Sequence, residues 1–279
     1  MANGSVRTIA MLRADPRLAN SLADTRLASF PFLTPEERAA MRDCAATRRP
    51  VRIGMELVRE GDPVDTVYFL EDGWACQYTT TRDGRRQISA LLLPGDICNL
   101  DALLFRQLDV GVRMLTHGSV LAVPRERVAT LAANYPGIMQ CFTWLGLSEN
   151  TILSRRTLCL GRLSARERLA HLLCELAVRL GHVASEGPVT FAMPLTQEHI
   201  ADVLGLTPVH VNRSFRQLRT EGLLSSTRGT IGVCDIVALR RAGEFQPGYL
   251  HVQELRNGST IDLRDANRRE TLHMFEGPR

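Results

Sequence analysis

One stretch of the chain concentrates side chains that can hydrogen-bond to flat polar groups. The segment from Thr207 to Thr220 contains no acidic residue and carries His210, Asn212, Arg213, Arg216 and Arg219. A guanidinium group can fork onto guanine O6 and N7, and an asparagine amide onto adenine N6 and N7. Further arginines can contact phosphates, which gives affinity without reading sequence. These residue types therefore predict contact with duplex nucleic acid.

A helix-turn-helix is the element that would hold these side chains. Thr196 can cap a first short helix, and Gly205 permits a sharp turn with positive φ. Thr207 and Pro208 suit the cap and first position of a second helix. Apolar residues at helical spacing would face the core: Ile200, Val203, Leu204, Val211, Phe215 and Leu218.

A wing is predicted directly after this pair of helices. Residues 223–225 and 230–233 can form a hairpin around Arg228 and Gly229, and Asp235 can cap a closing helix to about Arg241. Cap, turn, cationic helix and wing agree with one another, which favours a winged helix-turn-helix over an ordinary helix pair.

The first half of the chain has the texture of an antiparallel barrel or sandwich. From Arg49 to Pro124, short apolar runs alternate with turn signals such as Asp72-Gly73, Asp83-Gly84 and Pro94-Gly95. Before this region, Thr34, Pro35 and Glu37 predict a capped helix ending near Ala46. Helical periodicity returns over residues 125–134, and Ser164 with Glu167 predicts another capped helix ending at Gly181.

A long helix is predicted from Pro136 to about Leu160, with a hinge at Gly161. Two rows of residues repeat every seven positions: Ile138, Leu145, Ile152 and Cys159, and beside them Phe142, Glu149 and Arg156. Such spacing is typical of a two-helix coiled-coil seam. The alternative is a helix packed on its own domain, where Glu149 and Arg156 would be awkward. They fit better as an interchain pair, so we predict a dimer seam on these seven residues.

The layout from about residue 28 to 245 resembles the Crp–Fnr superfamily of bacterial regulators. The resemblance is carried by Leu195–Ala201, Gly205–Thr207 and Val211–Arg213, and in the β-rich region by Val58–Pro63 and Leu93–Asp96. It implies a cyclic-nucleotide-binding-like β-roll, a long dimerisation helix and a C-terminal winged helix. It also implies a dimer whose two recognition helices lie about one DNA turn apart on a palindromic site.

The DNA-contacting residues follow from the motif and the resemblance together. The family's base-reading arginine corresponds to Arg213, and the small polar position before it to Asn212. Many members carry a glutamate four residues before that arginine, where this chain has Val209, so His210 and Asn212 would take over part of the reading. The expected contacts are Thr196, Gln197, Thr207, Val209, His210, Asn212, Arg213, Arg216 and Arg228.

The ligand side of the resemblance departs further from the family. Cyclic-AMP-binding members hold ribose and phosphate with a Gly-Glu pair and an Arg-Ser or Arg-Thr pair. This chain reads Cys98–Asp101 and Leu108–Gly111 at those places. We predict no cyclic-nucleotide binding, with Arg106 and Arg113 as the nearest substitutes for the missing arginine.

No cofactor or metal site is expected. No cysteine precedes Cys44, which does not support an N-terminal iron–sulfur cluster, and the lone His117 is a weak basis for haem. The seven cysteines include no Cys-x-x-Cys pair, so buried thiols are favoured over zinc or disulfides. Cys159, on the predicted seam, is the best redox candidate among them.

Composition sets broad limits on the class of protein. The chain has 279 residues, 44% hydrophobic and 23% charged, with a formal net charge of +4 that permits a nucleic-acid partner without requiring one. No run of 18 apolar residues and no secretory signal occurs, so a cytoplasmic location with no membrane contact is expected. Nucleophile-elbow, Walker, zinc-protease and dinucleotide motifs are missing from the sequence, which argues against an enzyme.

These observations predict an α+β chain in five parts. They are a flexible lead-in (1–27), a β-roll (28–135), a dimerisation helix (136–160), a winged helix-turn-helix (161–245) and a loosely attached C-terminal tail (246–279). The expected function is a homodimeric, sequence-specific DNA-binding transcription regulator. Its effector is unknown, and contact with RNA polymerase is left open. The alternative is a small-molecule or redox sensor with a degenerate DNA domain and a protein-contact output.

Overall fold

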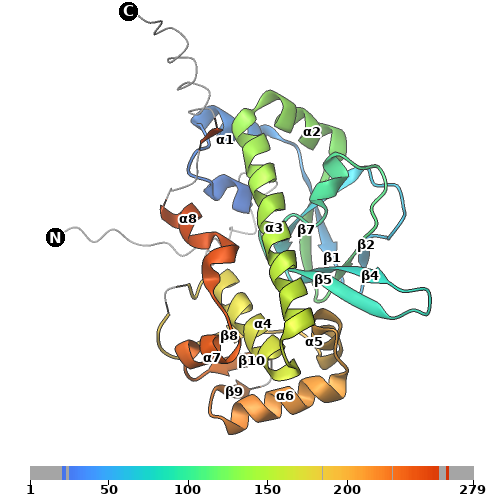
Figure 1. The fold of residues 1–279 in the computed structure, drawn as a ribbon. Coiled ribbons are helices and arrows are strands. Elements are labelled where there is room, and N and C mark those ends of the chain that lie inside the picture. Colours follow the sequence, from blue (N-terminus) through green and yellow to red (C-terminus); the bar gives the residue numbers. More distant parts are fainter. Residues whose placement is uncertain (1–20, 23–24, 184, 228, 258–261, 264–279) are drawn as a thin grey trace, which may run out of the picture.

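A single long helix links two differently built halves of the molecule (Figure 1). The computed structural model describes residues 21–22, 25–183, 185–227, 229–257 and 262–263. An antiparallel β-roll fills the N-terminal half, and a winged helix lies at the far end of helix α3 (Pro136–Arg162). This is the mixed α and β architecture that the sequence predicts.

Two antiparallel sheets form the β-roll. One sheet has the order β1-β7-β3 and the other the order β2-β6-β4-β5. Their inward-facing apolar residues, including Val67, Phe69 and Val112, join one core cluster because successive side chains of a strand alternate between its faces. The strands are β1 (Thr47–Val51), β2 (Glu56–Val58), β3 (Thr66–Asp72), β4 (Ala75–Thr80), β5 (Arg86–Leu92), β6 (Gly111–Met114) and β7 (Gly118–Pro124).

Short helices close the β-roll at one end. They are η3 (Arg26–Ser29), α1 (Pro35–Asp43), η4 (Leu100–Leu103) and α2 (Arg125–Asn134). The capping box of α1 forms as predicted, with Glu37 N–H donating to Thr34 Oγ1 at 3.1 Å and Thr34 N–H to Glu37 Oε2 at 2.8 Å. The helix ends before the predicted Ala46, because the chain must straighten to pair as β1.

The predicted lead-in needs correction where it is described. Leu22 and Leu27 are buried in the β-roll core, and Arg26 pairs with Asp96 at 3.0 Å. This stretch is therefore packed, and the rest of the predicted lead-in, residues 1–20 and 23–24, lies outside the described residues.

Helix α3 begins at Pro136 as predicted but runs through Gly161. The chain leaves helical geometry at Leu163, with φ −95° and ψ 146°. Ser164 then caps α4 (Ala165–Arg179), with Glu167 completing the second predicted capping box. The link between α3 and the winged helix therefore lies two residues beyond the predicted hinge.

The predicted seam residues face this chain's own core. Ile138, Phe142, Arg156 and Cys159 are buried, and Leu145, Glu149 and Ile152 are half-buried. The exposed apolar side chains of α3 lie on another face: Met139, Leu147, Leu153 and Leu158. The two rows that repeat every seven residues form the packed side of the helix, because other elements of the same chain cover them. A spacing pattern in the sequence does not reveal those neighbours.

The winged helix has one element more than predicted. The sheet order is β8-β10-β9, and β8 was not predicted although its alternating burial, with Val189 and Phe191 inward, is typical of a strand. The elements are α4, β8 (Val189–Ala192), α5 (Gln197–Leu204), α6 (Pro208–Thr220), β9 (Leu224–Thr227), β10 (Thr230–Val233) and α7 (Ile236–Ala242).

The C-terminal segment is firmly packed where it is described, contrary to the prediction of a loosely attached tail. It forms η5 (Pro247–Leu250) and α8 (Val252–Asn257) and lies beside α3 (Figure 1). Leu250 and Leu255 are buried. Within the described ranges no helix is both long enough and apolar enough to cross a membrane.

Candidate DNA-binding surface

Helix α5 begins with a capping box built on a histidine. Thr196 Oγ1 accepts the His199 N–H at 3.1 Å, and the Thr196 N–H points at His199 Nδ1 at 3.4 Å. Burial lowers the pKa of His199, and the nearby Arg86 lowers it further. The ring therefore stays neutral at physiological pH, so that Nδ1 can accept this hydrogen bond.

The turn between α5 and α6 depends on Gly205. Its backbone is left-handed, with φ 60° and ψ 42°, and its N–H donates to Ala201 O. A Cβ at this position would lie 3.2 Å from Leu160 Cδ2 on α3. Because side chains other than hydrogen strain both the dihedral angles and this contact, glycine fixes the angle at which α6 leaves the turn.

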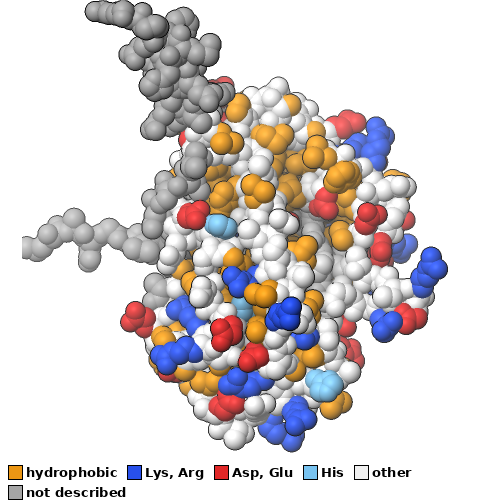
Figure 2. All heavy atoms as spheres, viewed as in Figure 1, with side chains coloured by type: hydrophobic (Ala, Val, Ile, Leu, Met, Phe, Trp, Pro, Cys, Tyr) orange, Lys and Arg blue, Asp and Glu red, His pale blue; other side chains and the backbone are white. Residues whose placement is uncertain are grey.

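Helix α6 buries one stripe and exposes the rest. Val211, Ser214, Phe215 and Leu218 are buried, whereas Asn212, Arg213 and Arg216 are exposed. Val209 is 76% exposed in the first turn of the helix. In Figure 2, arginine side chains lie over the half of the molecule that the winged helix forms, with acidic side chains among them.

The free donors of α6 are its arginines and its asparagine. Among the described residues, Arg213, Arg216 and Asn212 have no side-chain hydrogen bond or ion pair, while Arg219 lies 5.5 Å from the Phe215 ring. Thr207 Oγ1, in contrast, lies 3.1 Å from His210 Nδ1 and also accepts the His210 N–H. The surface thus offers two unengaged guanidinium groups and one unengaged amide.

The structure brings most of the predicted DNA contacts to one pair of helices. Their exposed positions on α5 and α6 are Thr196, Gln197, Thr207, Val209, His210, Asn212, Arg213 and Arg216. Arg228 lies outside the described residues. Thr196 and Thr207 serve as helix caps, which leaves their hydroxyls less free for a ligand than the sequence suggests.

An ion pair that sequence reasoning missed holds the first of these helices on the β-roll. Arg86 of β5 donates to Asp202 Oδ2 from Nε at 2.8 Å and from Nη2 at 2.6 Å. The neighbouring Gln87 amide donates to Val203 O at 3.2 Å. Because 116 residues separate the two partners of each contact, no local sequence pattern predicts these contacts.

A second network ties α3 to α4 and to the β-roll. Arg156 Nη2 donates to Glu175 Oε1 at 3.1 Å, and Arg179 lies 3.5 Å from the same oxygen. Arg179 also pairs with Asp96 at 2.8 Å, and Asp96 with Arg26. The predicted interchain use of Arg156 is therefore wrong, because its partner lies on α4 of the same chain.

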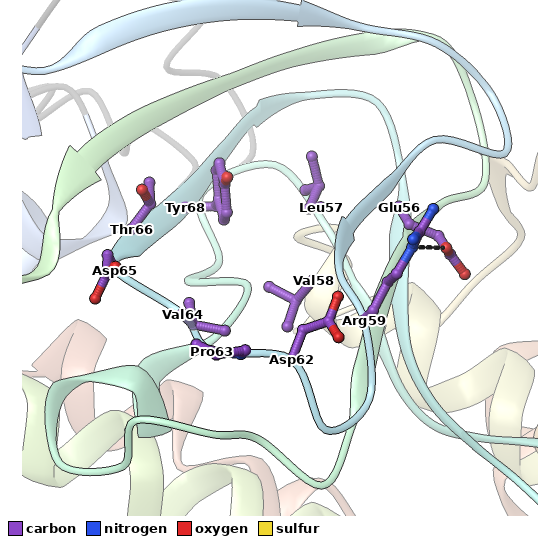
Figure 3. Close-up of a pocket in the computed structure, with 10 residues that line it drawn as sticks. All are labelled: Glu56, Leu57, Val58, Arg59, Asp62, Pro63, Val64, Asp65, Thr66 and Tyr68. Carbon is purple, nitrogen blue, oxygen red and sulfur yellow. Dashed lines mark hydrogen bonds and ion pairs between the residues drawn. The ribbon is translucent and has the colours of Figure 1, made fainter.

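One cavity lies beside this ion-pair network, and another lies in the β-roll. One, of about 370 Å³, is lined by β5, α3 and the C-terminal segment, and its three arginines, Arg26, Arg156 and Arg179, are all paired with carboxylates. The other, of about 360 Å³, lies at the loop before β3 (Figure 3). Its arginine, Arg59, pairs with Glu56 at 3.0 Å.

The positions that correspond to the family's nucleotide-binding pairs have structural roles here. Asn99 is fully buried, accepting the Tyr68 N–H and donating to Thr66 O, each at 2.9 Å. Leu108 is buried in the core, Arg106 is exposed, and Arg113 pairs with Glu56 at 2.7 Å. Neither Arg106 nor Arg113 therefore offers an unpaired guanidinium group inside a cavity in place of the missing arginine.

The cysteines are unsuited to fast redox chemistry, with one exception. All except Cys234 are buried. Burial raises the pKa of Cys76 to about 11 and of Cys174 to about 12, and it raises the pKa of Cys159. A thiol with a raised pKa is a weak nucleophile, which counts against Cys159 as a redox sensor.

Comparison with known proteins agrees with both halves of the fold. The model of the cyclic nucleotide-binding domain matches residues 48–135, and that of the Crp-like helix-turn-helix domain matches residues 167–242. The transcriptional activator protein FnrL of Cereibacter sphaeroides is 32% identical over 209 residues, covering 73% of this chain and 84% of that protein. An anaerobic regulatory protein of Pasteurella multocida is 28% identical over 214 residues, 75% of this chain and 77% of its own length.

The solved structures include a close match in architecture. FixK2 from Bradyrhizobium japonicum superposes with a TM-score of 0.65 at 30% identity, covering 71% of this chain and 97% of FixK2. With its β-roll, long helix and winged helix-turn-helix, the chain belongs to the Crp/Fnr family of transcription regulators, which are not enzymes.

Proposed function

We propose that this regulator binds a palindromic DNA site as a homodimer and reads each half-site with α6. The observation that carries the proposal is the exposed face of α6, where Arg213, Arg216 and Asn212 have no partner among the described residues. Unpaired donors on the exposed face of a helix are suited to base edges and phosphates.

Each exposed residue of α6 suits a different group on DNA. Arg213 can fork onto a guanine and Asn212 onto an adenine, while Arg216, one turn further on, suits a phosphate. Val209 is apolar and 76% exposed, which suits a thymine methyl group and not the cytosine amine that glutamate would accept from. The half-site would therefore differ from that of relatives with glutamate at this position.

A dimer seam fits the outer face of α3. Exposed or half-buried residues alternate at spacings of four and three along this face: Met139, Thr143, Gly146, Asn150, Leu153 and Thr157. Leu147 and Leu158, 61% and 48% exposed, flank the row. This is the spacing of a coiled-coil seam. The seam thus replaces the one first predicted from the buried rows.

Cyclic AMP does not suit this chain as an effector. A cyclic phosphate needs an unengaged cation, and the arginines that line the two cavities already pair with carboxylates. The segment that corresponds to the family's arginine, Leu108–Gly111, contains no arginine. Adding a phosphate to such a site would leave a buried charge without a partner, which is unfavourable.

The test is selective capture of genomic DNA fragments by the full chain, with and without 3′,5′-cyclic AMP. Captured palindromes should lose affinity in Arg213→Ala by about 1–3 kcal/mol, or roughly 5- to 150-fold. The matched control Arg127→Ala, on α2, removes the same charge at the opposite end of the molecule. Failure to capture any fragment selectively would favour the alternative sensor with a protein-contact output, and capture only with nucleotide would refute the effector argument.

A further inference from the structure

The segment after the winged helix returns to α3 and touches both halves of the molecule. We name residues 247–257, which form η5 and α8, the C-terminal brace. They lie beyond both matched family ranges, 48–135 and 167–242. Leu250, 3% exposed, joins the core cluster that the winged helix shares with β4 and β5 of the β-roll, whereas Leu255, 8% exposed, joins the inner core of the β-roll.

Tyr249 makes more side-chain contacts than the other brace residues whose side chains the structure describes. Its Oη lies 3.1 Å from His171 Nε2 and 3.3 Å from Glu175 Oε2, both on α4. Its ring stacks on His171 with centroids 5.9 Å apart. Burial and Glu175 raise the pKa of Tyr249, so the phenol stays protonated and can donate.

The same residue also holds α3. The Arg155 guanidinium lies 5.2 Å from the Tyr249 ring centroid, and Thr151 Oγ1 donates to Tyr249 O at 2.7 Å. The side chain and the backbone carbonyl of Tyr249 therefore connect the C-terminal half of α3 to α4. Beyond it, His251 lies edge-on to Trp144 of α3, with ring centroids 6.5 Å apart.

The brace contacts the ion-pair network that joins α3, α4 and the β-roll. Glu175, which Tyr249 contacts, also pairs with Arg156 of α3 and with Arg179. Leu250 and Val252 form part of the wall of the 370 Å³ cavity that Arg156 and Arg179 also line. Movement of α4 relative to α3 would thus break the brace contacts and disturb the ion pairs together.

A mechanical consequence follows from the chain path. The covalent link from α3 to α4 is the short extended segment at Leu163 and Ser164. The winged helix is also held on the β-roll by the Arg86–Asp202 pair and by a shared apolar core. The brace adds a further connection, which joins α4 directly to α3. Its contacts fall on α3 and α4, whereas the exposed face of α6 stays uncovered.

We propose that the C-terminal brace locks the winged helix on α3 with its DNA-reading face outward, so that the regulator is ready to bind without a small-molecule effector. The inference rests on the proposed DNA-binding function. A dimer binds a palindrome well only if its two reading helices are held at the right separation. If loss of the brace cuts the competent fraction to about a tenth, the apparent affinity falls by the same factor.

Two chain lengths test the brace. A chain ending at Gln246 lacks it, and a control chain ending at Leu263 keeps it. Hydrogen exchange at residues 160–166 should accelerate in the shorter chain only, because α3 and α4 lose the contacts that the brace makes to both of them. Affinity for a captured DNA fragment should fall roughly tenfold in the same chain. Unchanged exchange and affinity would overturn the proposal, and tighter DNA binding would overturn it by making the segment an inhibitor.

Point variants keep the test valid if the shorter chain folds poorly. Tyr249→Phe retains the ring and removes the hydroxyl contacts to His171 and Glu175, and Gln253→Ala changes an exposed residue of α8. We expect hydrogen exchange at residues 160–166 to be faster in Tyr249→Phe and unchanged in Gln253→Ala. Equal exchange rates in the two variants would refute the proposed role of the brace. A wild-type chain that binds no DNA, yet shows this exchange difference, would reject the proposed function and leave the mechanical role standing.

Discussion

Removing Arg156 tests whether the two halves of the molecule are held by buried charge. Its side chain is 7% exposed, and it donates to Glu175 and to Ser89 O of β5. Taking one partner from a buried ion pair costs about 3–5 kcal/mol, because the remaining charge stays unpaired in a poor solvent. Glu175 keeps Arg179 at 3.5 Å and Tyr249 at 3.3 Å. We therefore expect Arg156→Met to lose about 3 kcal/mol, the low end of that range.

A double-mutant cycle isolates the pair. Urea unfolding at neutral pH would be followed for Arg156→Met, Glu175→Gln and the double variant, with free energies from linear extrapolation. Removing both charges leaves neither one stranded, so the double variant should lose at least 1 kcal/mol less than the sum of the single losses. Losses that simply add, or a loss below about 1 kcal/mol in Arg156→Met, would refute the reasoning.

Four further outcomes are expected. Leu147→Glu, on the exposed face of α3, should convert a dimer to a monomer in light scattering, whereas retention of the dimer would exclude the seam proposed here. Thr196→Ala, which removes the α5 cap, should lose about 1 kcal/mol in urea unfolding. Arg216→Ala should weaken all DNA equally and reduce the salt slope by about 1 in binding titrations; a change in sequence preference would contradict its phosphate role. Burial, and after it Asp96, raises the pKa of Glu149 to about 7, above its unfolded value. The free energy of unfolding should therefore fall as pH rises from about 4.5 through 7, and Glu149→Gln should flatten that pH dependence.

Local signals were enough to predict where the capped helices begin. Thr34, Ser164, Thr196, Thr207 and Asp235 each cap the helix that follows them. A cap satisfies N–H groups two or three residues away, so its information is contained in a few neighbouring residues. The same is true of the left-handed turn at Gly205, which needs no distant partner to be recognised.

Contacts between distant elements were not predictable in this way. Both α3 rows that repeat every seven residues are covered by the chain itself, and the row that stays open begins one residue later, at Met139. A helix of mixed polarity offers several stripes, and only the packed fold decides which neighbour covers each one. The Arg86–Asp202 pair and the Tyr249 contacts are hidden for the same reason, since their partners lie 74 to 116 residues apart.

Nearly every side of helix α3 packs against another part of the protein or belongs to the proposed dimer seam. One side packs into the β-roll, a second carries Thr151 and Arg155 against the brace, and the third presents the row that the proposed dimer would bury. Most helices on a protein surface keep a solvated side that tolerates almost any polar residue. In a saturation-mutagenesis screen, α3 should therefore accept fewer substitutions per residue than α2, and its evolution should be slow even where no residue meets DNA.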